Sequence, residues 1–189
     1  MLILNADTGV NLIQDGTVTS AKIVDGSVTN DDLQTPYRMV QMTPVTASGT
    51  SVDFTGIPAW AKKITVMFSG VSTNGTSNQI VQIGTSLGVE ASGYLGSEGY
   101  SATFLNHSSG FLYVNGVSAT ALISGSMELD MISSNKWVER SILSTEATAN
   151  TFQGSGSKTL SGTLDRIRIT TVNGTDTFDA GTINIMVEG

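Results

Sequence analysis

The side chains that could carry out catalysis are few in this chain and lie far apart. His107 is the only histidine, so a Ser-His-Asp triad would have to use it. It lies in Asn106–Gly110, a loop composition without the Gly-x-Ser-x-Gly pattern of a nucleophile elbow. The chain has no cysteine, which excludes disulfides, thiolate metal sites and a cysteine nucleophile. We therefore expect His107 to be a solvated loop residue rather than a general base.

Two pairs of carboxylates have sequence spacings that could suit catalysis or metal binding. Glu128 and Asp130 alternate with apolar residues within Met127–Met131, so both face one side of a predicted strand. A glycosidase needs two carboxylates about 5 to 10 Å apart in a groove, but the solvent side of a half-buried strand explains this pair better. Asp176 and Asp179 lie in a turn, where Asp side chains accept backbone N–H bonds, and no EF-hand pattern surrounds them. We expect no catalytic residue, no metal site and no cofactor. We therefore expect that the protein is not an enzyme.

The residue composition of the segment Leu87–Gly110 favours ligand binding rather than catalysis. Its mixture of Tyr, Ser, Gly and Asn is typical of adaptable recognition surfaces. A long loop between strands is also where binding residues usually lie. The candidate ligand-binding residues are Tyr94, Tyr100, Phe104 and His107. The alternative, which stays open here, is a mobile loop whose aromatic residues pack at a subunit interface.

The N-terminal residues 1–35 form a repeat that predicts an extended stalk. Ile13–Thr19 (IQDGTVT) recurs ten residues later as Ile23–Thr29 (IVDGSVT). Asp-Gly favours a tight turn, so each unit reads as two short extended pieces around a turn. One apolar residue in five cannot build a core within one chain, but several chains can share a seam. The seam residues are expected to be Ile13, Val18, Ile23, Val28 and Leu33. A flexible linker, the alternative, gives no reason to keep this register.

Residues 36–189 are predicted to form a separate all-β head. Short apolar or alternating runs are separated by turn pairs such as Asn-Gly, and no window of twelve or more residues has a helical period. We expect an antiparallel β-sandwich of jelly-roll type, with Trp60 and Trp137 in its core. The strands are expected near Tyr37–Met42, Ile64–Val71, Asn78–Ile83, Gly110–Val114, Ala119–Ile123, Ser126–Ile132, Lys136–Leu143, Lys158–Ser161, Ile167–Val172 and Thr182–Val187.

Charge and hydropathy argue against two classes of partner. The formal net charge is −7, and the densest basic spots are only Lys62-Lys63 and Arg166-Ile-Arg168. Nucleic acid binding needs clustered Lys and Arg, so we expect none. The longest uncharged stretch, Ile64–Val89, is broken throughout by polar residues, which predicts no membrane insertion. Met1–Leu4 has no preceding basic residue and turns polar at once, so we expect no secretory signal.

Several of these motifs resemble a known family. The Asp-Gly-Thr/Ser-Val-Thr repeat resembles the shaft-like segments of bacteriophage tail-fibre proteins. The head resembles a domain that is widespread at the C-termini of small phage tail-fibre proteins. The matching stretches, which cover most of the chain from Val52 onward, are Val52–Trp60, Ile64–Gly75, Leu164–Ile169 and Asn173–Ile185.

The resemblance implies a homotrimeric virion protein that is assembled in the host cytoplasm. Its N-terminal stalk would attach to other virion proteins, and its exposed C-terminal head would bind a host-surface glycan or protein. Members of the family differ in what they recognise, so no binding residue is carried over. Some members sit on the phage head, and a head fibre or capsid decoration protein is therefore the main alternative to a tail fibre. A small glycan hydrolase or esterase and a cellular surface lectin are less favoured.

Overall fold

The computed structural model describes residues 23–24, 26–34, 37–100, 103–106, 108–148 and 150–189. The chain divides into two units, Met1–Gln34 and Thr35–Gly189. Within the described ranges, no helical segment has the length and apolarity that a membrane span requires.

The described part of the first unit holds one short 3-10 helix, η2 (Asn30–Asp32). The Asp32 carboxylate accepts hydrogen bonds from the Thr29 N–H and the Thr29 hydroxyl, each at 2.8 Å. Two of the predicted seam residues, Ile23 and Val28, are exposed in the single chain, at 45% and 56%, and Leu33 is partly buried. Ile13 and Val18 lie outside the described residues. The repeat stalk and its shared seam therefore stay predictions.

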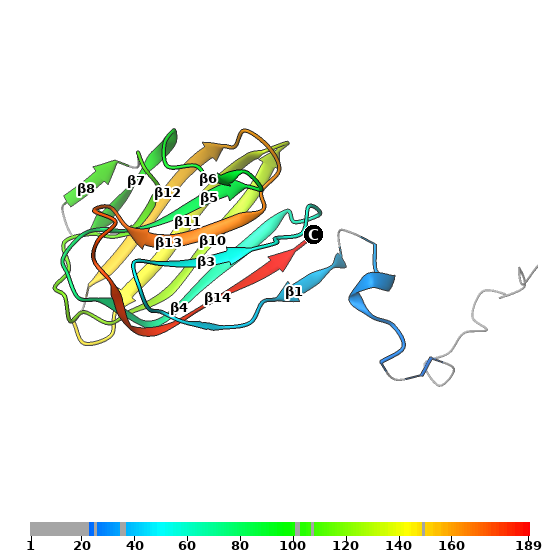
Figure 1. The fold of residues 1–189 in the computed structure, drawn as a ribbon, viewed down its shortest axis with the longest axis horizontal. Coiled ribbons are helices and arrows are strands. Elements are labelled where there is room, and N and C mark those ends of the chain that lie inside the picture. The colour runs from blue at the N-terminus through cyan, green and yellow to red at the C-terminus, as the bar shows by residue number, and fades with distance from the viewer. Residues whose placement is uncertain (1–22, 25, 35–36, 101–102, 107, 149) are drawn as a thin grey trace, which may run out of the picture. The chain divides into compact units, whose positions relative to one another are not determined.

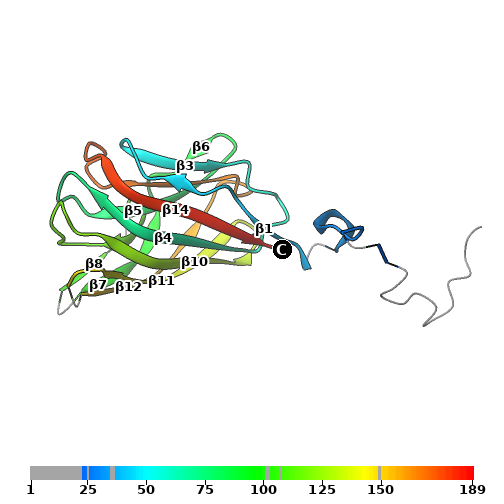
Figure 2. The same ribbon diagram turned by 90° about the horizontal axis from the view of Figure 1, so that it is seen from below.

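The second unit consists of two antiparallel sheets, which appear as two layers in Figures 1 and 2. The larger sheet has nine strands, and β2 (Val45–Thr46) pairs with its β14. Its other strands, in spatial order, are β1 (Met39–Gln41), β14 (Phe178–Glu188), β4 (Lys63–Thr73), β10 (Ile123–Ser133), β11 (Lys136–Thr145), β12 (Thr151–Thr159), β7 (Tyr94–Tyr100) and β8 (Thr103–Asn106). The smaller sheet has the order β3 (Ser51–Thr55), β13 (Arg166–Thr171), β5 (Gln79–Thr85), β6 (Gly88–Val89), with β9 (Phe111–Val114) also paired to β5.

Aromatic contacts join the two sheets through β9. The rings of Phe68 on β4 and Tyr113 on β9 stack with their centroids 4.5 Å apart. Tyr94 on β7 meets Phe111 on β9 edge to face, at 4.9 Å. Such ring pairs contribute about 0.5–1.5 kcal/mol each beyond the area that they bury. The inward residues of both sheets thus form one hydrophobic core, in which Trp137 is only 2% exposed.

The all-β class and the two antiparallel sheets are confirmed, whereas several segments differ from the sequence prediction. No strand is predicted for β3, and the strand expected at Lys158–Ser161 is β12, which spans Thr151–Thr159. Leu87–Gly110 is not a long loop, because it contains β6, β7 and β8. Residues 119–122 are not a strand, since β10 begins at Ile123 and the Ala121 N–H donates to the Ser118 carbonyl in a turn. The jelly-roll description is finer than this two-sheet architecture and stays a prediction.

Candidate functional site

The four candidate ligand-binding residues have different placements. Tyr94 lies in the core, 2% exposed, and its hydroxyl accepts the Ile83 N–H at 2.8 Å and donates to the Glu90 carbonyl at 2.8 Å. Burial raises the pKa of Tyr94, so the hydroxyl remains protonated. Tyr94 is therefore a hydrogen-bonded core residue rather than a surface contact. Tyr100 ends β7, and its side chain lies outside the described atoms, as does His107.

Phe104 is the candidate that the structure places at a surface. It is 73% exposed on the edge strand β8. It pairs with Gly99 of β7, and a Cβ added to Gly99 would lie 2.5 Å from the Phe104 ring. The ring therefore covers a position without a side chain, on the side of the sheet that faces away from the core. We call this side of the nine-stranded sheet the outer face.

The strand register extends the outer face from Phe104 across four more strands. The residue opposite Gly99 is Gln153 of β12, which pairs with Ile142 of β11. Ile142 in turn pairs with Ser126 of β10. Gln153 is exposed, and Ile142 is 65% exposed. Glu128 and Arg140 pair directly with each other one step further along β10 and β11. We define the outer-face patch as Phe104, Ser126, Glu128, Arg140, Ile142 and Gln153.

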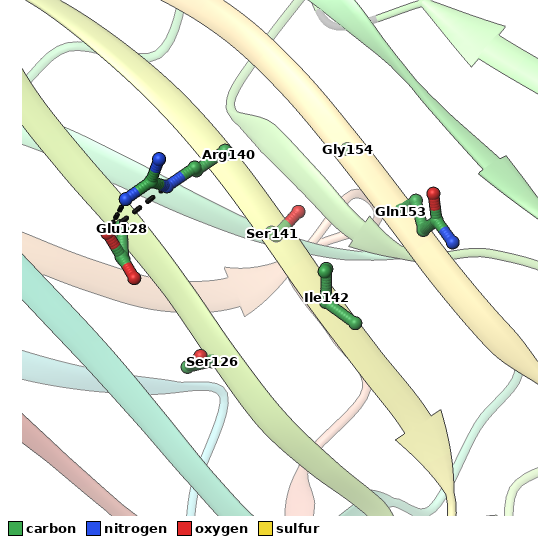
Figure 3. A pocket seen from close by; sticks show the side chains of 7 residues that line it. All are labelled: Ser126, Glu128, Arg140, Ser141, Ile142, Gln153 and Gly154. Carbon is green, nitrogen blue, oxygen red and sulfur yellow. Dashed lines mark hydrogen bonds and ion pairs between the residues drawn. The ribbon is translucent and has the colours of Figure 1, made fainter.

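Most of the outer-face patch lines one open depression, drawn in Figure 3. The depression has a volume of about 280 Å³. The close-up shows Glu128 and Arg140 joined across neighbouring strands, with Gln153 on the strand beyond. The lining residues are Ser126, Glu128, Arg140, Ser141, Ile142, Gln153 and Gly154.

An ion-pair cluster fixes the charged end of the depression. Arg140 donates to Glu128 Oε2 from Nε at 3.1 Å and also from Nη2. Lys63 Nζ lies 3.4 Å from the same oxygen. The hydrogen bond from Arg140 is the main cause that lowers the pKa of Glu128, while slight burial opposes it. Because Arg140 is 68% exposed, the pair contributes little to the stability of the fold, and its main effect is to hold both side chains in place.

The side chains of this patch are suited to binding a ligand through hydrogen bonds and apolar contacts. It presents a carboxylate, a guanidinium, an amide and a hydroxyl, beside exposed apolar groups on Phe104 and Ile142. An arginine has five N–H donors, so a bond to one carboxylate leaves others for a ligand. Of the second carboxylate pair, only Asp176 lies in the turn, where it accepts the Ser77 N–H at 2.9 Å and the Asn173 amide at 2.7 Å. Asp179 lies on β14 and accepts a hydrogen bond from the Ser72 hydroxyl. Over the described ranges, no group of three or more His, Asp or Glu could hold a metal ion.

Sequence reasoning identified part of this patch. The composition of Leu87–Gly110 makes Phe104 a candidate, and the alternation in Met127–Met131 predicts that Glu128 faces solvent. Arg140, Ile142 and Gln153 gave no signal of their own, because only the pairing of β10, β11 and β12 brings them together. Comparisons of the chain with protein-family models, with curated proteins and with solved structures found no match.

Proposed function

We propose that this chain is a structural protein of a bacteriophage virion, a trimeric tail fibre whose head binds a host-surface glycan. The observation that carries the proposal is the outer-face patch, where hydrogen-bonding and apolar side chains lie together around an open depression on paired strands. The stalk repeat and its resemblance to phage fibre shafts support the virion and trimer parts of the proposal.

The patch suits a glycan because of the chemistry of sugars. A sugar ring has hydroxyls on its rim and C–H groups on its faces. The carboxylate of Glu128, the guanidinium of Arg140 and the amide of Gln153 offer both acceptors and donors to hydroxyls. Phe104 and Ile142 offer apolar contact area, of which the aromatic ring is the more rigid. An open depression also admits a chain of sugars, whose ends extend beyond the site.

The patch residues lie on paired strands rather than on loops, so hydrogen bonds between the strands hold their backbone positions relative to one another. The bonds to Glu128 already hold Arg140 in place, so less binding energy is lost to ordering that side chain when a ligand binds. A single open site of this size binds weakly. Three heads on one stalk raise the apparent affinity by avidity, without any additional contact.

The experiment that tests the patch is replacement of Arg140 by alanine. We expect R140A to weaken binding of the full-length protein to host-surface polysaccharide by about tenfold or more, as for other central contacts of an interface. The fold should persist, because Glu128 keeps its contact with Lys63. Binding is measured by surface plasmon resonance on immobilised polysaccharide, and folding by thermal denaturation.

Arg168 provides a matched control on the smaller sheet. Its Nε and Nη2 donate to the two oxygens of Asp53 across β13 and β3, at 2.7 and 2.9 Å. R168A therefore removes a similar cross-strand ion pair but leaves the outer-face patch unchanged, and it should bind like the wild type. If R140A and R168A lost binding equally, the outer-face patch would not be the glycan-binding site.

A further inference from the structure

The inner side of the nine-stranded sheet contains a pair of buried carboxylates that the proposed function does not use. Glu98 on β7 is fully buried, and Glu139 on β11 is 4% exposed. Strand β12 runs between them and has Gly154 opposite Glu98 and Gly156 opposite Glu139. Because Gly154 and Gly156 have no side chains, no side chain of β12 separates Glu98 from Glu139 on this side of the sheet. Charged side chains are almost never fully buried without a partner, so this pair calls for an explanation.

Oxygen atoms from two sheets converge on the space above Gly154. A Cβ added there would lie 2.6 Å from Ser141 Oγ, 3.2 Å from the Leu112 carbonyl oxygen and 3.3 Å from Glu139 Oε1. Leu112 belongs to β9 of the smaller sheet, whereas Ser141 and Glu139 belong to β11. A hydroxyl, a carbonyl and a carboxylate oxygen thus surround one position between the layers.

Most of these oxygens lack a partner. Both carboxylate oxygens of Glu139, Oε1 of Glu98 and the hydroxyl of Ser141 are buried and make no hydrogen bond of good geometry. The other Glu98 oxygen accepts a hydrogen bond from the Asn115 amide. Burial is the main cause that raises the pKa of Glu139 to about 7, with the Ser141 hydroxyl lowering it and the charge of Glu98 raising it. An unpaired buried carboxylate is strongly destabilising.

Among the described residues, no Lys or Arg forms an ion pair with Glu98 or Glu139. Lys158, the buried lysine on β12, is bonded to Glu90 at 2.5 Å. The donors that remain are all oxygens, which is the donor set of a hard cation. Two carboxylates match a double positive charge. Calcium accepts six to eight oxygens in irregular geometry, whereas magnesium requires a near-ideal octahedron, so this arrangement of side-chain and backbone oxygens favours calcium.

We propose that Glu98, Glu139 and Ser141 bind a calcium ion between the two sheets, with the Leu112 carbonyl as a further ligand. The ion links β7 and β11 of the larger sheet to β9 of the smaller sheet. It also lies beneath the outer-face patch, since Ser141 is flanked by Arg140 and Ile142 on β11, and Gly154 follows Gln153 on β12. The site is independent of the ligand that the outer face binds.

The test is calcium titration of the full-length protein at pH 8, after removal of metal with a chelator and at constant ionic strength. We expect isothermal calorimetry to find one site per chain. The melting temperature should rise by about 5 to 10 °C at a hundredfold excess over Kd. In E139Q and E98Q, both responses should be lost. Without calcium, E139Q should be at least as stable as the wild type, because it removes a buried charge.

Two further measurements make the result decisive. Terbium, which replaces calcium and emits when excited through nearby aromatic rings, should luminesce on excitation of the wild-type protein, because Trp137 lies two residues from Glu139 on β11. Little emission is expected from E139Q. E128Q, which alters a carboxylate of the outer face, should retain the full calcium response. Absence of a thermal shift in the wild type, or an equal shift in E139Q, would overturn the site and leave a shared proton as the explanation of the buried pair.

Discussion

Replacing Gly125 with alanine is expected to destabilise the head by several kcal/mol. Gly125 lies on β10 with φ +141°, a backbone conformation that is essentially restricted to glycine. A new Cβ would lie 2.4 Å from the Ile142 carbonyl oxygen and 2.7 Å from the Leu143 Cα. Both atoms belong to the backbone of β11, so relief requires the strands to separate. We expect a loss of about 4 kcal/mol or more, combining backbone strain with overpacking, measured by urea unfolding.

Gly88 is the matched control for this substitution. Its φ is +143°, close to that of Gly125, but nothing lies within 4 Å of an added Cβ. G88A therefore adds only the conformational strain, about 1–3 kcal/mol. If G125A and G88A were equally stable, the close approach of β10 and β11 described here would be wrong. That approach matters for function, because these two strands carry Ser126, Glu128, Arg140 and Ile142.

Placing aspartate at both Ile13 and Ile23 is expected to lower the apparent affinity for a polysaccharide-coated surface by about 10²- to 10⁴-fold. The proposed seam buries these residues among three chains, and an unpaired charge there is costly, so the trimer should dissociate. Each free head then binds alone and loses the gain from avidity. Analytical ultracentrifugation reports the assembly, and surface binding reports the affinity.

Val24 supplies the control for the stalk variant. It is 75% exposed and lies one residue outside the seam register, so V24D adds a charge to the same segment without entering the seam. This variant should remain a trimer and bind normally. The avidity argument fails if the double variant becomes monomeric yet binds the surface as tightly as the wild type.

The fold was predictable where burial produces an alternating pattern. In β10 and β14, apolar residues occupy every second position, as in Met127–Met131 and Ile183–Val187, and both strands were found near the expected bounds. Strand β7 gave no such signal. Its residues include Gly96 and Gly99, and its buried Glu98 stands where an alternating strand would carry an apolar side chain. Composition alone therefore suggested a loop.

The candidate site was less predictable than the fold, for a physical reason. A patch on a sheet is assembled by register, which depends on how strands far apart in sequence align. Phe104 and Gln153 come together only because β7 pairs with both β8 and β12. The buried pair of Glu98 and Glu139 is also a product of register. Each residue, taken singly, would be expected on the surface.

The measurement that tests the central claim most directly is competition for host cells. Cells are incubated with purified full-length protein and then challenged with the phage that is proposed to carry it, and free phage are counted over time. We expect saturating wild-type protein to slow adsorption at least about tenfold, and R140A at the same concentration to have much less effect. If saturating wild-type protein leaves adsorption unchanged, the chain does not bind the receptor, and a head fibre or decoration role takes the place of the one proposed.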